Sequence, residues 1–182
     1  ADDGADKGDE RYRYIGIDKD IMKLSQVHAV DGDVVLDDEF SLFTIKSRSH
    51  ELPSTNRRLL VKTGDTFTRD DFVHEHYLVV ASEGKHILIS GCAHNGILSI
   101  LDAYKEVYGA APDMVVSGFH LMKKVDYTED EIEEVRSIAR ELGNYDTKFV
   151  TCHCTGVPAY ELMKEIMGEQ LVYAHSGDEV EV

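Results

Sequence analysis

The sequence is short of cysteine, proline and positive charge, and it has no tryptophan. Three cysteines among 182 residues are too few, and odd in number, for a disulfide framework, so we interpret them as reduced thiols. Only 19 lysines and arginines oppose 35 aspartates and glutamates, and the formal net charge is −16. Nucleic acid is therefore not an expected partner, because no basic surface is left to neutralise its phosphates.

Long apolar runs are missing as well. No stretch reaches the roughly 18 consecutive apolar residues of a membrane-spanning helix, and the N-terminus lacks the basic and apolar regions of a secretory signal. We expect no membrane association and a cytoplasmic location. Residues 1–10 are acidic and poor in apolar side chains, so we expect them to be disordered and followed by one domain over residues 11–182.

Several catalytic sequence signatures are also absent. The chain has no GxSxG, GxGxxG or GxxxxGK motif, and no defensible Ser-His-Asp arrangement. This argues against an α/β-hydrolase-type serine enzyme, a dinucleotide-binding fold and a P-loop protein. Any catalysis must rest on other side chains.

Apolar periodicity predicts alternating strands and helices over the second half of the chain. Helices are expected over residues 97–108, 128–142 and 157–167, the second opening on a capping box. Strands are expected over residues 77–81, 86–90, 114–116, 149–151, 171–174 and 180–182. Before them we expect a small antiparallel meander over residues 14–46 and a long loop over residues 47–75. This order predicts an α/β fold, with a mixed sheet and helices packed on one face.

Chemically versatile side chains follow three of these strands at the point where each strand ends. The junctions are Ser90-Gly-Cys-Ala-His94-Asn-Gly96, Ser117-Gly-Phe-His120 and Thr151-Cys-His153-Cys-Thr-Gly156. Sites in open α/β sheets form at the carboxyl ends of strands, so we expect the three histidines at one edge. Neutral imidazole is a ligand for zinc, iron and manganese, and the helix N-termini behind the junctions could bind an anionic group.

Each of these features also has an ordinary structural explanation. A single histidine at a strand end is more often a hydrogen-bonded structural residue than a ligand, and only the coincidence of three favours a metal. Cys152 and Cys154 flank His153 in an extended segment, so the three side chains cannot share one face. We therefore interpret the two cysteines first as small buried residues. His74-Glu75-His76 could place two histidines on one strand face, but no further ligand follows, and we take His74 as a neighbour of the site.

Three stretches carry a resemblance to a known family. LVVASEGKHILISGCAHNGILSIL (residues 78–101), MVVSGFHLM (114–122) and FVTCHCTGVPAYELM (149–163) resemble, in that order, the C-terminal half of the metallo-β-lactamase superfamily. The branch that they resemble most contains hydrolases related to dihydropterin and ribofuranosylaminobenzene-phosphate synthases. The resemblance runs from about residue 12 to residue 182 and implies the C-terminal half of an αββα sandwich.

The resemblance also implies a site. Its metal ligands would be His94, His153 and Cys92, and its substrate-binding residues would be His120, His74, Thr155 and Gly156. The superfamily holds two metal ions, for which zinc is the first expectation and iron and manganese are alternatives. There, metal-activated water attacks the substrate, which we expect here to be small and anionic.

One defining motif of the superfamily is missing. The HxHxDH loop, which supplies most ligands of the two-metal site, occurs nowhere in the sequence. We therefore expect the C-terminal portion of a hydrolase whose N-terminal half is cleaved off, separately encoded or left out, with weak metal binding and little activity on its own. Self-association, or a separate N-terminal half, is the expected partner. The alternatives are an inactive remnant or binding module and, less favoured, a Cys-x-Cys redox or metal-storage role.

Overall fold

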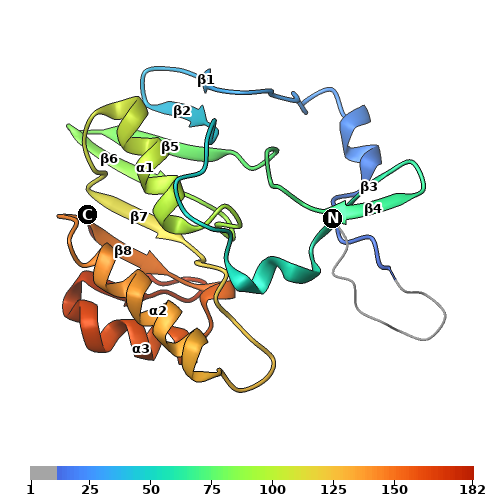
Figure 1. Ribbon diagram of the computed structural model, residues 1–182. Helices are drawn as coiled ribbons and strands as arrows, with labels where there is room; N and C mark the ends of the chain where they lie inside the picture. Colours follow the sequence, from blue (N-terminus) through green and yellow to red (C-terminus); the bar gives the residue numbers. More distant parts are fainter. Residues whose placement is uncertain (1–11) are drawn as a thin grey trace.

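A computed structural model of the chain describes residues 12–182 (Figure 1). The acidic segment over residues 1–10, for which we expected disorder, lies outside the described residues. Within the described part, no helix is both long and apolar enough to cross a membrane.

The centre of the fold is a seven-stranded mixed sheet. Its strands, in spatial order, are β1 (Val34–Val35), β2 (Phe40–Phe43), β5 (Tyr77–Ser82), β6 (Lys85–Ile89), β7 (Met114–Ser117), β8 (Lys148–Thr151) and β9 (Leu171–Tyr173). The first four strands pair antiparallel, and β6 to β9 pair parallel. The turn between β5 and β6 has positive φ at Glu83 and Gly84, as a two-residue hairpin with a type I′ turn requires. The parallel strands are joined through helices, as parallel pairing requires.

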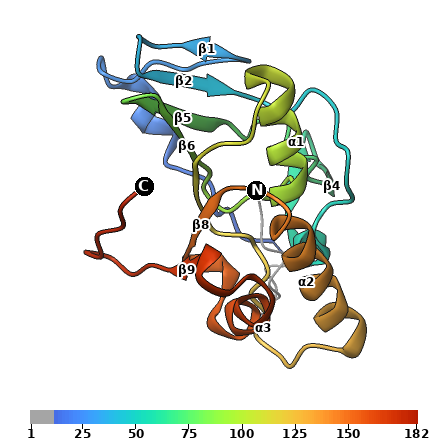
Figure 2. The ribbon, with the colours of Figure 1, turned by 90° about the vertical axis from the view of Figure 1, so that its left-hand side faces the viewer.

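Three helices lie on one face of this sheet (Figures 1 and 2). They are α1 (Ile97–Tyr108), α2 (Glu129–Leu142) and α3 (Val157–Met167), with the bounds that the apolar periodicity predicts. The capping box at α2 is present, because the Thr128 hydroxyl accepts from the Glu131 N–H and the Glu131 carboxylate accepts from the Thr128 N–H. Gly109 ends α1 in the left-handed conformation that glycine adopts at little cost.

The first third of the chain differs from the predicted meander and loop. It contains short 3-10 helices at η1 (Lys19–Lys23) and η2 (Ser54–Arg58), and a separate two-stranded hairpin of β3 (Leu60–Thr63) and β4 (Thr66–Arg69). The expected loop over residues 47–75 therefore contains a hairpin, whose mostly exposed strands give no strong apolar alternation. Two further 3-10 turns, η3 (His153–Thr155) and η4 (Gly168–Gln170), flank α3.

The strand predicted over residues 180–182 is wrong. Within residues 12–182 the C-terminal tail pairs with no strand, and lysine side chains hold it instead: the Nζ atoms of Lys85 and Lys148 donate to the carbonyls of Val182 and Glu181 at 2.7 and 2.6 Å. A three-residue apolar alternation is too short to separate a strand from a tail that packs in an extended form.

The two faces of the sheet differ in what covers them. On the helix face, large side chains such as Phe43, Tyr77, Leu88 and Phe149 are fully buried in the core that the helices complete. The other face is also apolar, and its residues follow from the strand register: Phe40, Leu42, Leu78, Val80, Ile87, Ile89 and Val116. These side chains remain partly exposed, with Phe40 and Ile89 each at 36%. Met114 and Val150 lie on the same face and are buried, so the fold leaves this apolar sheet face open mainly over β2, β5 and β6, opposite the helices.

Candidate metal centre

Three loops meet at the carboxyl edge of the parallel part of the sheet. The loop after β6 carries Cys92 and His94, the loop after β7 carries His120, and the turn after β8 carries His153 and Cys154. Because β6, β7 and β8 are adjacent and parallel, their carboxyl ends lie at the same edge.

The side chains from the three loops are in successive contact. The ring centroids of His94 and His120 are 4.5 Å apart, and Cys92 Sγ lies 3.6 Å from His153 Nδ1. One ligand atom each from Cys92, His120 and Cys154 lies within 4.8 Å of the other two. The structure therefore brings together His94, His153, Cys92 and His120 from the sequence-predicted site, while their individual roles remain predictions.

The backbone around this cluster is held in an uncommon conformation. Ala93, His120 and His153 have φ values of 47°, 52° and 48°, in the left-handed region that non-glycine residues rarely occupy. Each such residue costs on the order of 1 kcal/mol, and such residues persist where surrounding structure enforces them, often at functional sites. Each of the three loops contributes one such residue at the same edge of the sheet. This coincidence marks the cluster as a candidate functional site.

The η2 segment fixes two of these loops from behind. The Thr55 hydroxyl donates to the carbonyl of His120, and Asn56 Nδ2 donates to the carbonyl of His94 at 2.6 Å. Asn56 is almost fully buried, so this bond replaces water that the carbonyl has lost. The positions of His94 and His120 therefore depend on a segment distant in sequence.

Glu75 orients the ring of His94. Its Oε1 atom accepts from the His94 N–H at 2.9 Å and lies 3.1 Å from His94 Nδ1. Its Oε2 atom accepts from Asn95 and from the Tyr77 hydroxyl, the latter at 2.7 Å. A carboxylate on one ring nitrogen leaves the other nitrogen to face a metal, which is how metal-ligating histidines are usually held.

The same contacts set the ionisation of Glu75. Burial alone would raise its pKa, but hydrogen bonds from His94, Tyr77 and the neighbouring backbone outweigh it and lower the pKa to about 2. Burial also raises the pKa of Tyr77, which therefore stays a hydroxyl donor. Glu75 is thus a permanent negative charge behind His94, and a positive ion in front of that ring would be stabilised.

The thiol groups of Cys92 and Cys154 have pKa values that are shifted in opposite directions. Hydrogen bonds from Cys154 and then His120 lower the pKa of the Cys92 thiol to about 4, against the effect of its partial burial. The hydrogen bond to that thiolate, together with burial, raises the pKa of Cys154. At neutral pH Cys92 is a thiolate, which is the form of cysteine that binds metals.

Gly118 gives Cys154 the room to enter the cluster. A Cβ at Gly118 would lie 2.6 Å from Cys154 Sγ and 3.3 Å from the Cys152 carbonyl oxygen, well inside contact distance. We expect Gly118→Ala to lower the free energy of unfolding by about 1–3 kcal/mol, as overpacking does in a buried site. Gly91→Ala is the matched control, because a Cβ there meets nothing within 4 Å. Urea unfolding of both variants tests this; equal midpoints would show that the space beside Cys154 is not tight.

The remaining predicted substrate-binding residues lie around the cluster in different ways. His74 is largely exposed and has its Nδ1 atom 3.7 Å from Asp70. Thr155 is fully buried, and its hydroxyl accepts from the Phe119 N–H at 2.8 Å and contacts the Thr151 hydroxyl at 2.5 Å. Gly156, with φ of 73°, caps the start of α3 against Met122. Substrate binding by these residues stays a prediction, and the hydroxyl of Thr155 is already committed within the protein.

The donor set fits a zinc-class metal. Imidazole and thiolate are borderline or soft ligands that suit zinc, whereas magnesium and calcium prefer oxygen. His120 Nδ1 is buried and has no hydrogen-bond partner within residues 12–182, so it has a ligand position to offer.

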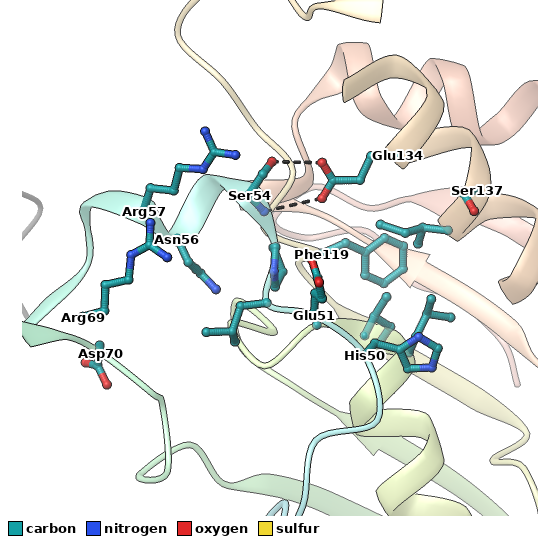
Figure 3. Close-up of a pocket in the computed structure, with 16 residues that line it drawn as sticks. His50, Glu51, Ser54, Asn56, Arg57, Arg69, Asp70, Phe119, Glu134 and Ser137 are labelled. Atoms are coloured by element: carbon teal, nitrogen blue, oxygen red, sulfur yellow. Dashed lines mark hydrogen bonds between the residues drawn. The ribbon is translucent and has the colours of Figure 1, made fainter. Parts of the chain in front are cut away.

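A cavity of about 520 Å³ lies between the η2 segment, the start of α1 and α2 (Figure 3). The Ser54 hydroxyl closes one side by donating to Glu134 of α2 at 3.0 Å. The guanidinium groups of Arg57 and Arg69 lie at another side (Figure 3). Asn56, which holds His94, is part of the wall, so the cavity borders the back of the histidine cluster without including its ligand atoms.

Sequence reasoning missed two of these residues. Glu75 stood between two histidines that drew attention as possible ligands, and nothing local shows that its partners are His94 and Asn95. Cys154 was assigned to the core, which its 5% exposure supports, but its sulfur also faces Cys92 and His120. The turn η3 breaks the extended geometry on which the argument about strand faces rested.

The chain is similar to two curated proteins of Methanocaldococcus jannaschii. It is 26% identical to an uncharacterised protein over 172 residues, which are 91% of this chain and 60% of that protein. It is 30% identical over 109 residues to 7,8-dihydropterin-6-methyl-4-(beta-D-ribofuranosyl)-aminobenzene-5'-phosphate synthase, covering 59% of this chain and 35% of that protein. No family profile matches the sequence.

The fold is similar to a crystal structure of a metal-dependent hydrolase of the β-lactamase superfamily. The TM-score is 0.67 with 28% sequence identity, over 85% of this chain and 57% of that protein. This confirms the prediction of a mixed α/β, metallo-β-lactamase-like fold. The chain spans 60% of the length of the uncharacterised protein and 57% of the length of the crystallised protein. It is therefore shorter than both of these similar proteins.

Proposed function

We propose that this chain is the C-terminal portion of a metal-dependent hydrolase, which acts on a small anionic substrate once the preceding half of the fold is supplied. The observation that carries the proposal is the meeting of His94, His120 and His153 at one sheet edge, with Glu75 behind His94. A buried carboxylate that fixes one imidazole in place is a costly arrangement for a purely structural histidine.

The residues of this chain would divide the work of such a site. His94, His153 and Cys92 would hold the metal, and Glu75 would keep the His94 ring in its binding orientation. The metal, when bound, supplies a water of lowered pKa and polarises the substrate. Arg57 and Arg69, beside the cavity behind the cluster, offer charge for an anionic group of the substrate, and the free N–H groups at the start of α3 offer hydrogen bonds.

The missing part of the site has a natural place on this chain. Residues such as Leu78, Val80, Ile87 and Ile89 form the open apolar sheet face opposite the helices. A second sheet packed there would bury that face at the usual sheet-to-sheet spacing and bring further ligands to the same edge. The HxHxDH segment of the superfamily is the occupant we propose, and a second copy of the chain covers the face when that segment is absent.

This proposal predicts different behaviour for the chain and for a longer product that carries HxHxDH before it. We expect the 182-residue chain to show little hydrolysis of bis(p-nitrophenyl) phosphate, a lactone or a β-lactam, because two imidazoles and one thiolate cannot fix a metal pair. The longer product should show zinc-dependent turnover of at least one of these probes. Light scattering on the same samples should show an oligomer for the short chain and a smaller assembly state for the longer product.

Two outcomes would contradict it. Robust metal-dependent turnover by the short chain, present as a monomer, would show that no further half is needed. A coding sequence with no HxHxDH upstream or in a neighbouring reading frame, together with no turnover, would favour the alternative of an inactive binding module.

A further inference from the structure

Cys154 adds a second thiol to the cluster, outside the donor set of the proposed hydrolytic site. Its sulfur, the sulfur of Cys92 and a ring nitrogen of His120 lie within 4.8 Å of one another. We propose that Cys92, Cys154 and His120 form a thiolate site, which shares Cys92 with the hydrolytic donor set and binds one soft divalent metal ion, with a fourth position open. The proposal concerns a site that is complete within this chain and does not depend on hydrolysis.

The geometry is close to what such an ion requires. With metal–sulfur and metal–nitrogen distances of about 2.3 and 2.0 Å, ligand atoms around a tetrahedral ion lie roughly 3.5 to 3.8 Å apart. The observed separations, up to 4.8 Å, need to shrink by about 1 Å, which rotation of the Cys92 and His120 side chains can supply. Three protein ligands and one open position is a known arrangement of catalytic and labile zinc sites.

One feature of the cluster lacks an explanation without a ligand. His120 Nδ1 is buried and unpaired within the described part of the chain, although a buried polar atom without a partner costs on the order of 1–3 kcal/mol. His120 is also held at a positive φ, and the Thr55 hydroxyl bonds its carbonyl. An ion bound at His120 Nδ1 would give the orphaned atom a partner.

The surroundings favour a soft ion over a hard one. Cys154 is buried beside Gly118, whose missing side chain leaves space for its sulfur, and that sulfur lies 3.7 Å from the Cys92 carbonyl oxygen. Two sulfur ligands and one imidazole select zinc or cadmium over magnesium, calcium and manganese. The expected ligand set from sequence, His94, His153 and Cys92, does not include Cys154.

Cobalt(II) is a direct probe of the site, because thiolate-to-cobalt charge transfer reports sulfur ligation in the near ultraviolet. We expect the reduced, chelator-treated chain to develop this absorption with one equivalent of cobalt and to lose it on addition of zinc. Cys92→Ser and Cys154→Ser should each lower the absorption per chain by about half or more, because one of the two thiolates is lost. Cys152→Ser is the matched control, since Cys152 lies two residues from Cys154 and outside the cluster; it should match the wild type.

The result that overturns the proposal is equally specific. The proposal fails if the cobalt absorption is unchanged in Cys154→Ser, is lost in Cys152→Ser, or is absent in the wild type. A Cys92–Cys154 disulfide in the freshly reduced chain would also contradict it. If Cys154→Ser fails to fold by circular dichroism, Cys92→Ser and His153→Ala decide together, because Cys92 is only half-buried and His153 belongs to the hydrolytic donor set alone.

A further variant separates this site from the hydrolase. His153→Ala should keep the cobalt absorption of the short chain. If His153→Ala loses this absorption while Cys154→Ser retains it, the ion lies in the hydrolytic donor set. That result would overturn the thiolate site and leave the hydrolase proposal standing. The opposite result is a cobalt site with the expected cysteine dependence and no hydrolysis by the longer product. It would overturn the hydrolase proposal and leave the thiolate site standing.

Discussion

Replacing His153 with Ala is expected to reduce zinc-dependent hydrolysis by the longer, HxHxDH-containing product about a thousandfold. The metal contributes several kcal/mol of transition-state stabilisation through the water and substrate that it binds. Loss of about 4 kcal/mol corresponds to roughly three factors of ten in rate. His153 lies 3.6 Å from Cys92 at the carboxyl edge of β8, where no other histidine of the described chain follows that strand directly.

The control for this variant needs an exposed histidine. His175 is suitable, because its side chain is 73% exposed and its contacts are with its near neighbours Asp178 and Tyr173. His86 is not, since its Nδ1 atom lies 2.8 Å from the Tyr104 hydroxyl in the core. His175→Ala should therefore retain full activity. Equal rates for His153→Ala and His175→Ala, measured as kcat/KM on the same probe, would remove His153 from the metal centre.

Glu75→Gln is expected to lower the free energy of unfolding at pH 7 by about 3 kcal/mol. That figure corresponds to the difference between the ordinary pKa of 4.5 and the folded-state pKa of about 2. The carboxylate accepts from His94, Asn95 and Tyr77, and an amide would turn one accepting oxygen into a donor facing those donors. The same variant should weaken metal binding by roughly 10–100-fold, as loss of a carboxylate behind a ligating histidine does.

The stability difference between the wild type and Glu75→Gln should depend on pH in a defined direction. A carboxyl group whose folded-state pKa is lowered stabilises the fold above its unfolded pKa, and this stability is lost as pH falls through the folded pKa. The stability difference between wild type and Glu75→Gln should therefore be constant above pH about 5 and shrink between pH 4.5 and about 2. Urea midpoints measured across this range, for both proteins, test it. A difference that stays constant down to pH 2 would show that Glu75 is not held as a buried carboxylate.

The helices and the core strands could be predicted because local signals and packing agree there. The apolar period of α1, its terminal Gly109, and the capping box of α2 each act over a few residues, and the structure has the helix bounds that they predict. The hairpin of β3 and β4 could not be predicted, because its exposed strands carry no apolar period. The final strand was predicted from too few residues, and lysine side chains rather than a β-ladder hold that tail.

The candidate site divides in the same way. Histidines at the ends of adjacent parallel strands must meet at one edge, so the meeting of His94, His120 and His153 follows from topology. The partners behind them do not follow, because Glu75, Thr55 and Asn56 reach the cluster through irregular segments whose path no periodic pattern specifies. The burial predicted for Cys154 is confirmed, but its closeness to Cys92 and His120 was missed because a 3-10 turn, and not an extended strand, carries it.

The most direct measurement is the zinc content of the longer, HxHxDH-containing product, determined by elemental analysis for the wild type and for His153→Ala. The account predicts that the wild-type protein retains tightly bound zinc at the edge formed by β6, β7 and β8, and that His153→Ala holds at least one equivalent less per chain while remaining folded. Equal zinc content in the two proteins would contradict the claim that this edge is the metal centre of a hydrolase.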